Sequence, residues 1–370
     1  MTKQALEGVK VIDLTWVLVG PTTSMYLADY GATVVHVESS IWMDILRQGP
    51  PFKDGVVGLN RSGWFNNYNR NKLGMTLNLK HPQGVEVFKK MAAWADVVVE
   101  NFAAGVMVRM GLGYQDLARI KPDIVMLSTC MQGQTGPHAT HPGYGVQMAS
   151  LAGISQFMGW PDREPAIIYG AYTDSIVPRF AASAIVAALD YRRRTGKGQH
   201  LDLSQFETSL SFVAPAILDY TVNEKEIQRT GNRCAYAAPH GAYPCRGHDR
   251  WCAMSVFSDE EWQSFRRVMG DPEWSAQQRF ATLQGRKENE DELEALISAW
   301  SIDHTAEDLM AALQCGGVSA GLVASGEDLH SDLQLKHRQH FWTLDHPVAG
   351  AHAHDAPASR LTLTPAQPRT

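Results

Sequence analysis

The run VKVIDLTWVLVGPTTSMYLADYGATVVHVE, residues 9–38, decides the fold of this chain. Val9–Leu14 and Thr33–Glu38 are short apolar segments typical of buried strands, and Gly20-Pro21 introduces a helix between them. This order predicts a right-handed βαβ unit with parallel strands. Open sheets of this kind bind ligands at the carboxyl ends of their strands, so we expect the loop Thr15–Gly20 to lie at a ligand site.

The following segments extend this sheet. A long surface loop rich in Gly, Pro and Asn is expected from Arg47 to Asn71, and a Ser204-capped helix is expected to run through about Leu218. After about Tyr220 the pattern changes to that of a small α+β domain. The further strands of the sheet are predicted at Leu73–Leu79, Val97–Glu100, Ile124–Thr129 and His200–Leu203.

A second stretch, Ile167–Leu203, contains a candidate reactive residue. Asp174 lies between a strand-like apolar run, Ile167–Tyr172, and an Ala-rich helical segment. Pro178 is tolerated in a first helical turn, which predicts a helix start near Ser175. Asp174 would then lie in the strand-to-helix turn, where free N–H groups favour an anion. A carboxylate there can serve as a nucleophile, and the alternative is an ordinary helix-capping Asp.

The composition is typical of a globular protein. The 370 residues are 44% hydrophobic and 19% charged, and the formal net charge of −6 argues against a nucleic-acid-binding surface. The apolar run Trp16–Tyr30 is interrupted by Gly20-Pro21 and contains Asp29, which argues against a membrane span. Five cysteines form no CxxC pair and no signal peptide opens the chain, so a cytoplasmic location is expected. No complete four-ligand metal spacing is present.

Six segments in one order resemble a known family. They are LEGVKVIDLTWVLVGPTTSMYLADYGATVVHVE, NRNKLGMTLNLKHPQG, ADVVVENFAAGVMVRMGLGY, GQTGPHATHPGYG, YGAYTDS and RRRTGKGQHLDLSQFE. The family is the class III CoA-transferases, the group of formyl-CoA:oxalate CoA-transferase, carnitine CoA-transferase and α-methylacyl-CoA racemase. The resemblance covers nearly the whole chain, and six ordered segments are far more specific than one short motif.

The resemblance implies an α/β fold with a Rossmann-like large domain built from both chain ends. That domain would span 1–220 and be rejoined by 330–370, with a smaller α+β domain at 221–329. Members form homodimers of two interlinked ring-like subunits. Their chemistry moves CoA from an acyl-CoA donor to a free carboxylic acid through an aspartyl anhydride and an aspartyl-CoA thioester, with no ATP and no metal. Asp174 matches the family's catalytic aspartate.

The resemblance also implies a CoA site. The loop residues Trp16, Val17 and Leu18 match segments that line CoA in the family. Lys72 and Arg109 would contact phosphates, and Asn71, Asn101 and Phe102 complete the expected set. Two positions depart from the family pattern, because Ser39 and Leu73 stand where many members have basic residues. Arg47 and Arg70 are the candidates expected to replace those missing phosphate contacts.

The acceptor acid is less specified. The aromatic residues Tyr144 and Tyr172, together with others nearby, are expected to line a substrate pocket that suits a bulky or aryl-substituted dicarboxylate, as in the succinyl-CoA:benzylsuccinate branch. The racemase branch uses a His where this chain has Tyr144, which favours transferase over racemase. A 2-substituted acyl-CoA isomerase and a non-catalytic partner subunit, in a heteromer with a related chain, are the alternatives.

Overall fold

The computed structural model describes residues 4–369. The chain divides into two compact units. The first comprises Met1–Gln156, Ile167–Ile227 and Leu333–Thr370, and the second comprises Phe157–Ala166 and Gln228–Asp332. Within the described residues, no helix has the length and apolar character needed to cross a membrane.

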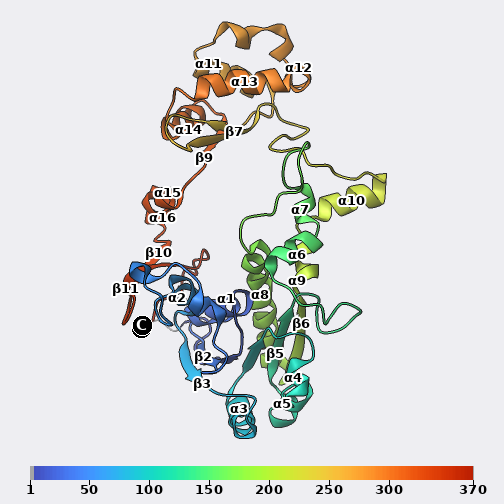
Figure 1. The fold of residues 1–370 in the computed structure, drawn as a ribbon, viewed down its shortest axis with the longest axis vertical. Coiled ribbons are helices and arrows are strands. Elements are labelled where there is room, and N and C mark those ends of the chain that lie inside the picture. Colours follow the sequence, from blue (N-terminus) through green and yellow to red (C-terminus); the bar gives the residue numbers. More distant parts are fainter. Residues whose placement is uncertain (1–3, 370) are drawn as a thin grey trace. The chain divides into compact units, whose positions relative to one another are not determined.

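A six-stranded parallel sheet forms the centre of the first unit (Figure 1). Its spatial order is β3-β2-β1-β4-β5-β6. The strands β2 and β3 therefore extend the sheet on one side of β1, and β4, β5 and β6 extend it on the other. This reversal puts the carboxyl ends of β1 and β4 side by side, which is where ligands bind in such sheets. The strands are β1 Lys10–Asp13, β2 Thr33–Glu38, β3 Leu73–Thr76, β4 Val97–Glu100, β5 Val125–Cys130 and β6 Gln199–Ser204.

Helices cover both faces of the sheet because its central strands are apolar on both sides. β4 is buried at every residue, and its side chains alternate between two cores. Val97 and Val99 pack with α1 (Val19–Asp29) and α8 (Tyr172–Thr195), whereas Val98 packs with α3 (Pro82–Trp94), α4 (Val106–Arg109) and α5 (Tyr114–Ile120). The result is a three-layer α/β/α arrangement, as predicted.

The remaining elements of the first unit lie around this sheet. The β10–β11 hairpin is antiparallel and comes from the C-terminal part of the chain. These elements are η1 Ile45–Gln48, η2 Lys53–Gly55, α2 Gly63–Asn69, α6 Gly145–Leu151, α7 Ile154–Phe157 at the boundary, α9 Gln205–Leu210, α10 Ala214–Asn223, α16 Leu333–His337, β10 Phe341–His346 and β11 Gly350–Asp355.

The second unit is a small α+β fold. Its antiparallel sheet has the order β7-β8-β9, and an aromatic core around Trp262, Phe265 and Phe280 holds the helices against it. Its elements are β7 His240–Pro244, β8 Trp251–Ser255, α11 Asp259–Met269, η3 Glu273–Ala276, η4 Gln278–Phe280, α12 Leu283–Glu288, α13 Glu290–Ser301, α14 Ala306–Cys315, β9 Ser319–Leu322 and α15 Gly326–Ser331.

Some predicted elements are wrong. Ile167–Tyr172 is not a strand, because no neighbouring strand pairs with it and Tyr169 is 99% exposed. The expected loop Arg47–Asn71 contains helix α2, whose first turn is capped by Ser62. Ser204 does cap a helix, as predicted, but that helix ends at Leu210 and α10 begins separately.

Candidate active site

The loop between β1 and α1 is held in a strained conformation. Val17 has a φ of 69°, a region that β-branched residues rarely adopt. The buried Asp44 carboxylate accepts the Val17 N–H at 3.1 and 3.2 Å and so holds this conformation. Asn101 fixes the preceding residue, because its side chain accepts the Trp16 N–H at 2.9 Å and donates to the Trp16 carbonyl at 2.7 Å. Asp44, which caps η1, and Asn101, which directly follows β4, therefore jointly position the loop.

A buried charge network lies at the end of β1. The Asp13 carboxylate accepts hydrogen bonds from Ser24 at 2.6 Å and from Lys72 at 3.0 Å, and it contacts His36 at 3.1 Å. Burial alone would raise the pKa of Asp13, but Lys72 and His36 outweigh it and hold that pKa well below its usual range. This carboxylate also accepts the Thr15 N–H at 2.9 Å, so the network anchors the start of the Thr15–Gly20 loop.

Asn71 and Lys72 therefore do not have the positions that the family resemblance implied. The Lys72 side chain is 1% exposed and its ammonium is surrounded by internal oxygen acceptors, so it does not present a charge to a phosphate. Asn71 donates to Asp29 at 2.7 Å, away from the loop. These partners come from distant parts of the chain, which is why the local sequence did not reveal them.

Helix α8 presents Asp174 in its first turn. The helix begins at Tyr172, earlier than the predicted start near Ser175, and Pro178 lies inside it. The predicted start was wrong because it assumed that proline cannot lie beyond the first helical turn. Pro178 does lie there, and because it has no N–H, the Asp174 carbonyl has no helical partner. The start of α6 packs against the same turn. A Cβ atom at Gly145 would lie 2.8 Å from the Asp174 carboxyl carbon, so only glycine allows this approach.

The Asp174 carboxyl is buried and isolated. It is 7% exposed, and among residues 4–369 it has no hydrogen-bonding or ion-pairing partner. Burial without compensation raises its pKa to about 6. An ordinary capping Asp accepts a backbone N–H, but the N-cap of α8 is Ala171, and Asp174, three residues later, accepts no such bond. The helix-capping alternative is therefore not adopted, and the carboxyl is left free to react.

A pocket of about 310 Å³ brings Asp174 together with most of the predicted site residues. The Trp16–Leu18 loop forms one wall and the Asn101–Phe102 turn another, with Trp16 and Phe102 in edge-to-face contact at 5.9 Å. Tyr144 also lines this pocket, whereas Tyr172 and Arg109 do not. Arg109 is exposed on α4, with no ion pair among the described residues, and Tyr172 lines a different pocket.

A second, smaller pocket adjoins the first through Trp16 and Phe102. It has a volume of about 250 Å³, and Lys80 and Trp42 line it, with the Lys80 ammonium 4.7 Å from the Trp42 ring. Ser39, where a basic residue was expected, lies in the same pocket. The sequence interpretation missed Lys80, although its position beside the apolar segment after Lys72 was a usable signal.

Arg47 and Arg70, the other cations predicted to contact phosphates, form ion pairs within the fold. Arg47 donates to Glu38 through Nε at 2.9 Å, and Arg70 pairs with Asp29 at 2.7 Å with its side chain only 2% exposed. Both guanidinium groups therefore stabilise the fold instead of facing the pocket, and their predicted role was wrong. Lys80 is a cation that the structure offers in their place.

The buried side chain of Glu100 holds the Asn101–Phe102 turn through a hydrogen bond. Glu100 is 2% exposed and accepts the Phe102 N–H at 2.8 Å. Burial raises the pKa of Glu100 to about 7. Ser128 contacts Glu100 and also lies 2.9 Å from His200.

One further titratable group, His141, lines the Asp174 pocket and was not predicted. Within residues 4–369, no group of three or more His, Cys, Asp or Glu side chains could hold a metal ion.

Comparison with known proteins identifies the family of this chain. The model of the family described as CoA-transferase family III matches residues 6–370. This chain belongs to that family. Among its relatives, succinyl-CoA–D-citramalate CoA-transferase of Chloroflexus aurantiacus is 32% identical, with 97% of this chain and 88% of that protein covered. Succinyl-CoA:glutarate CoA-transferase of Mus musculus is 31% identical, over 96% and 80%.

A solved structure supports the fold. The CAIB/BAIF family protein from Brucella suis superposes with a TM-score of 0.88 at 31% sequence identity, and the match covers 99% of this chain and 96% of that one. The protein is therefore a transferase of CoA-transferase family III with a mixed α/β fold, as the sequence predicted. CoA is a substrate of this family.

Proposed function

We propose that this protein moves CoA from an acyl-CoA donor to a free carboxylic acid, with Asp174 as the nucleophile. The isolation of the Asp174 carboxyl in the pocket wall carries this proposal. A carboxylate without hydrogen-bond donors keeps its electron pairs available, and a pKa near 6 leaves it ionised at neutral pH. Succinyl-CoA is the proposed donor, because the names of the two relatives above include it.

The proposed reaction has two symmetrical halves, and together they conserve the free energy of the thioester bond. The Asp174 carboxylate attacks the donor carbonyl carbon, and CoA thiolate leaves to give a mixed aspartyl anhydride. The thiolate then attacks the aspartyl carbonyl, which releases the donor acid and forms an aspartyl-CoA thioester. The acceptor carboxylate attacks that thioester to form a second anhydride. Return of the thiolate to the acceptor acyl carbon yields the new acyl-CoA and restores Asp174.

The pocket residues have proposed roles in this cycle. The Trp16–Leu18 loop and the Asn101–Phe102 turn would hold the pantetheine arm, and Lys80 would contact the phosphates. Arg109, which is exposed on α4 and lines neither pocket, would also contact them. A cation beside an aromatic ring, such as Lys80 over Trp42, is also suited to an adenosine phosphate group. The benzylsuccinate branch and the interlinked homodimer remain predictions. Light scattering of the purified chain would separate a homodimer from a chain that needs a related partner.

Trapping the covalent intermediate tests the proposal. After incubation with succinyl-CoA, we expect a CoA adduct on the peptide that contains Asp174, detected by mass spectrometry and released by hydroxylamine. Asp174→Asn should lose both the adduct and all acceptor turnover. Asp190→Asn is the matched control, because Asp190 lies on the same helix but pairs with Arg193 on the exposed side. Retained turnover in Asp174→Asn would overturn the assignment.

His141 supports a second candidate function. An imidazole and the Asp174 carboxyl line the same pocket, which is the arrangement that proton exchange at an acyl α-carbon requires. The transferase assignment is favoured because Asp174 lacks the partner that would orient it as a base. Deuterium from the solvent at the α-carbon of a 2-substituted acyl-CoA, without any acceptor acid, would instead support isomerisation.

A further inference from the structure

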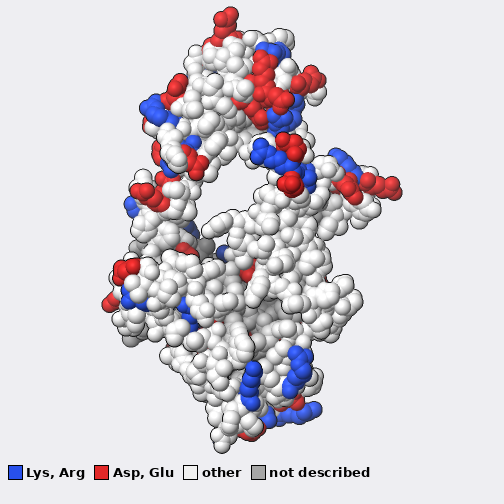
Figure 2. All heavy atoms as spheres, in the orientation of Figure 1, with Lys and Arg blue, Asp and Glu red and all other residues white. Residues whose placement is uncertain are grey.

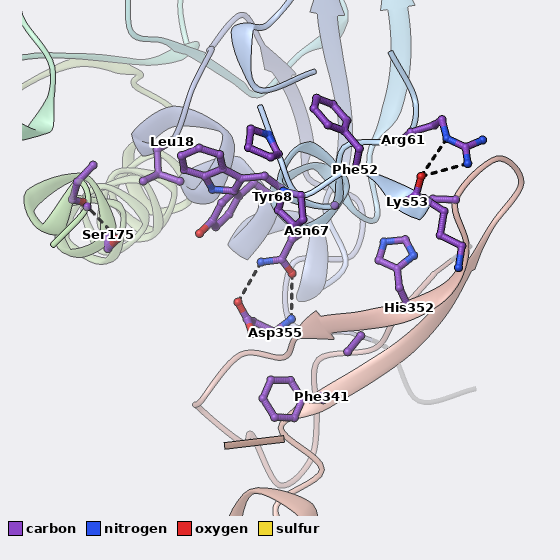
Figure 3. A pocket seen from close by; sticks show the side chains of 18 of the residues that line it. Leu18, Phe52, Lys53, Arg61, Asn67, Tyr68, Ser175, Phe341, His352 and Asp355 are labelled. Carbon is purple, nitrogen blue, oxygen red and sulfur yellow. Dashed lines mark hydrogen bonds between the residues drawn. The ribbon is translucent and has the colours of Figure 1, made fainter. Parts of the chain in front are cut away.

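A cavity of about 630 Å³ lies between α2, the β10–β11 hairpin and the first residues of β2 and β3. We call it the hairpin cavity. Hydrogen bonds between Asn67 and Asp355, at 2.9 Å in both directions, fasten the hairpin to α2 (Figure 3). The larger pocket drawn in Figure 3, of about 790 Å³, is a separate space, because no described residue lines both it and the hairpin cavity.

The hairpin cavity is also separate from the Asp174 pocket. Thr33 and Leu73, which begin β2 and β3, line it, so it lies beside the amino ends of these parallel strands. The Asp174 pocket is lined by Trp16 and Asn101, which follow β1 and β4 at the opposite end of the sheet. Among the residues that the structure describes, none lines both spaces. A ligand of the hairpin cavity would therefore be distinct from one beside Asp174.

Two buried polar side chains of the hairpin cavity lack partners. His354 is 4% exposed and Asn66 is 7% exposed, and both line the cavity. Neither ring nitrogen of His354 has a hydrogen-bond partner within residues 4–369, and the side-chain nitrogen of Asn66 also lacks one. Buried polar groups are almost always hydrogen-bonded, because an unpaired group keeps its full cost of desolvation. A bound ligand that accepts hydrogen bonds would supply the missing partners.

The charges that line the hairpin cavity are mainly positive. Arg70, Lys72 and Arg369 line it, against one acid, Asp345. The first two cations are paired with buried acids, whereas Arg369 donates to a backbone carbonyl and forms no ion pair among the described residues. Asp345 is exposed, so solvent screens its charge. The cavity therefore favours an anion over a cation.

The positive surroundings act on His354. Its ring packs on that of His352, with the centroids 4.4 Å apart. Burial, together with the charges of His352, Arg70 and His346, lowers the pKa of His354 to about 4, so the imidazole is neutral at pH 7. A neutral imidazole has one N–H donor and one bare nitrogen. An anion beside it would stabilise the imidazolium and so raise this pKa.

We propose that the hairpin cavity is a second ligand site, which binds the oxyanion group of a small molecule, a phosphate or a carboxylate. The Asn66 amide, one ring nitrogen of His354 and the Arg369 guanidinium donate hydrogen bonds to the oxyanion. Phe65 and Leu344 supply apolar surface for the rest of the molecule. This site goes beyond the proposed transfer reaction and does not depend on it.

Calorimetric titration with three similar probes tests the proposal. Phenyl phosphate and benzoate each carry one of the two oxyanion groups, and benzyl alcohol is their neutral analogue. At least one anion should bind about tenfold more tightly than benzyl alcohol, and the tighter anion identifies the group. Asp174→Asn should leave this binding unchanged, because Asp174 lines a different pocket. Failure of both anions to bind more tightly than the alcohol, or loss of binding in Asp174→Asn, would overturn the proposal.

Substitutions in the cavity wall test where the anion binds. Asn66→Ala and Arg369→Gln should each weaken binding of the tighter anion by about five- to tenfold, because each removes a donor. Asp345→Asn should strengthen it by about twofold, because a like charge is removed. Asn223→Ala is the control, since Asn223 lies on α10, bonds within that helix and does not line the cavity. Unchanged affinity in both Asn66→Ala and Arg369→Gln would overturn the site.

Sulfate tests the part that His354 plays, because sulfate keeps its charge over the pH range used. A bound anion raises the pKa of His354, so binding takes up a proton, and the affinity for sulfate should rise by about three- to tenfold from pH 7 to pH 5. His354→Gln should remove most of this rise. His337→Gln, at the exposed end of α16, should keep it. An equal rise in the wild type and in His354→Gln would overturn the assignment of His354.

Discussion

Burial gives the Asp174 carboxyl two opposing properties. A carboxylate that lacks donors is a better nucleophile, and the same lack of donors makes its ionised form costly in the folded protein. Loop residue Val17 carries a similar cost in its backbone and depends on Asp44 to keep its conformation. The proposed site thus contains two local costs that the rest of the first unit must offset.

The pH dependence of stability should reveal the cost of Asp174. Its pKa is about 6 in the folded protein and about 3.8 when unfolded, so the folded state loses stability as the pH rises from 4 to 6. We expect Asp174→Asn to gain about 3 kcal/mol relative to the wild type over this interval and to hold that gain above pH 6. Urea unfolding of both proteins at pH 4, 5, 6 and 8 measures the difference. A difference that does not vary with pH would contradict the assignment.

Glu100 should make substrate binding depend on pH. Its pKa of about 7 means that it loses its charge below neutrality, which weakens the bond that it accepts from the Phe102 N–H. We expect the KM for acyl-CoA to rise by about three- to tenfold between pH 8 and pH 6. Glu100→Gln should show the high KM at both values. The control is Glu207→Gln, since Glu207 lies at the exposed start of α9; a pH profile unchanged by Glu100→Gln would remove Glu100 from this role.

The sequence predicted which residues line the Asp174 pocket better than it predicted which charged side chains reach that pocket. Trp16–Leu18, Asn101, Phe102, Tyr144 and Asp174 line one pocket although they are far apart in the chain. Their positions follow from strand ends, which apolar periodicity locates well. Lysine and arginine side chains are long, and their partners are chosen by tertiary contacts, so the roles of Lys72 and the two arginines could not be read locally.

At the level of elements, strong local patterns were sufficient for most of the fold. β2 and β4 have the predicted bounds, because each is a short apolar run flanked by polar or turn residues. The β10–β11 hairpin was not predicted, since β11 (GAHAHD) is rich in His, Ala and Gly and lacks the aromatic and β-branched residues that β10 (FWTLDH) contains. Helix α2 was missed because its Asn-rich sequence has low helix propensity and tertiary packing decides its form.

The contact between the first turns of α6 and α8 should control reactivity. Gly145→Ala would place a methyl group 2.8 Å from the Asp174 carboxyl carbon and 2.9 Å from the Ala171 side chain. We expect the carboxyl to be displaced and kcat/KM to fall by about 100-fold, because small misplacements of reacting groups are costly. Gly74→Ala is the control, since a Cβ there meets nothing within 4 Å. Circular dichroism should show both variants folded, and full activity of Gly145→Ala would contradict the packing argument.

Over the whole molecule, the two units carry separate cores and a mixture of charges. On the face drawn in Figure 2, Lys and Arg side chains are interspersed with Asp and Glu and form no continuous basic surface. The C-terminal segment belongs to the first unit, where Arg369 donates to the Ala32 carbonyl at 2.9 Å and Gln367 donates to the Asp29 carbonyl at 3.1 Å. Distant parts of the sequence therefore stabilise the same layer.

Breaking the Asp29–Arg70 pair should destabilise one unit only. Arg70→Ala leaves a buried carboxylate without its main partner, at a cost of about 3–5 kcal/mol. Hydrogen exchange measured by mass spectrometry should show lost protection in β1 and β4 and unchanged protection in α11 and α13. Replacing both residues, with Asp29→Leu and Arg70→Met, should recover much of the loss. Equal loss of protection in both units would show that they unfold together.

The late position of the β10–β11 hairpin has a consequence for how this protein is made. A ribosome completes the six strands of the parallel sheet by Ser204, whereas it translates the hairpin only after the residues of the second unit. The nascent polypeptide therefore contains every strand of the sheet before it contains the C-terminal segment that completes the first unit.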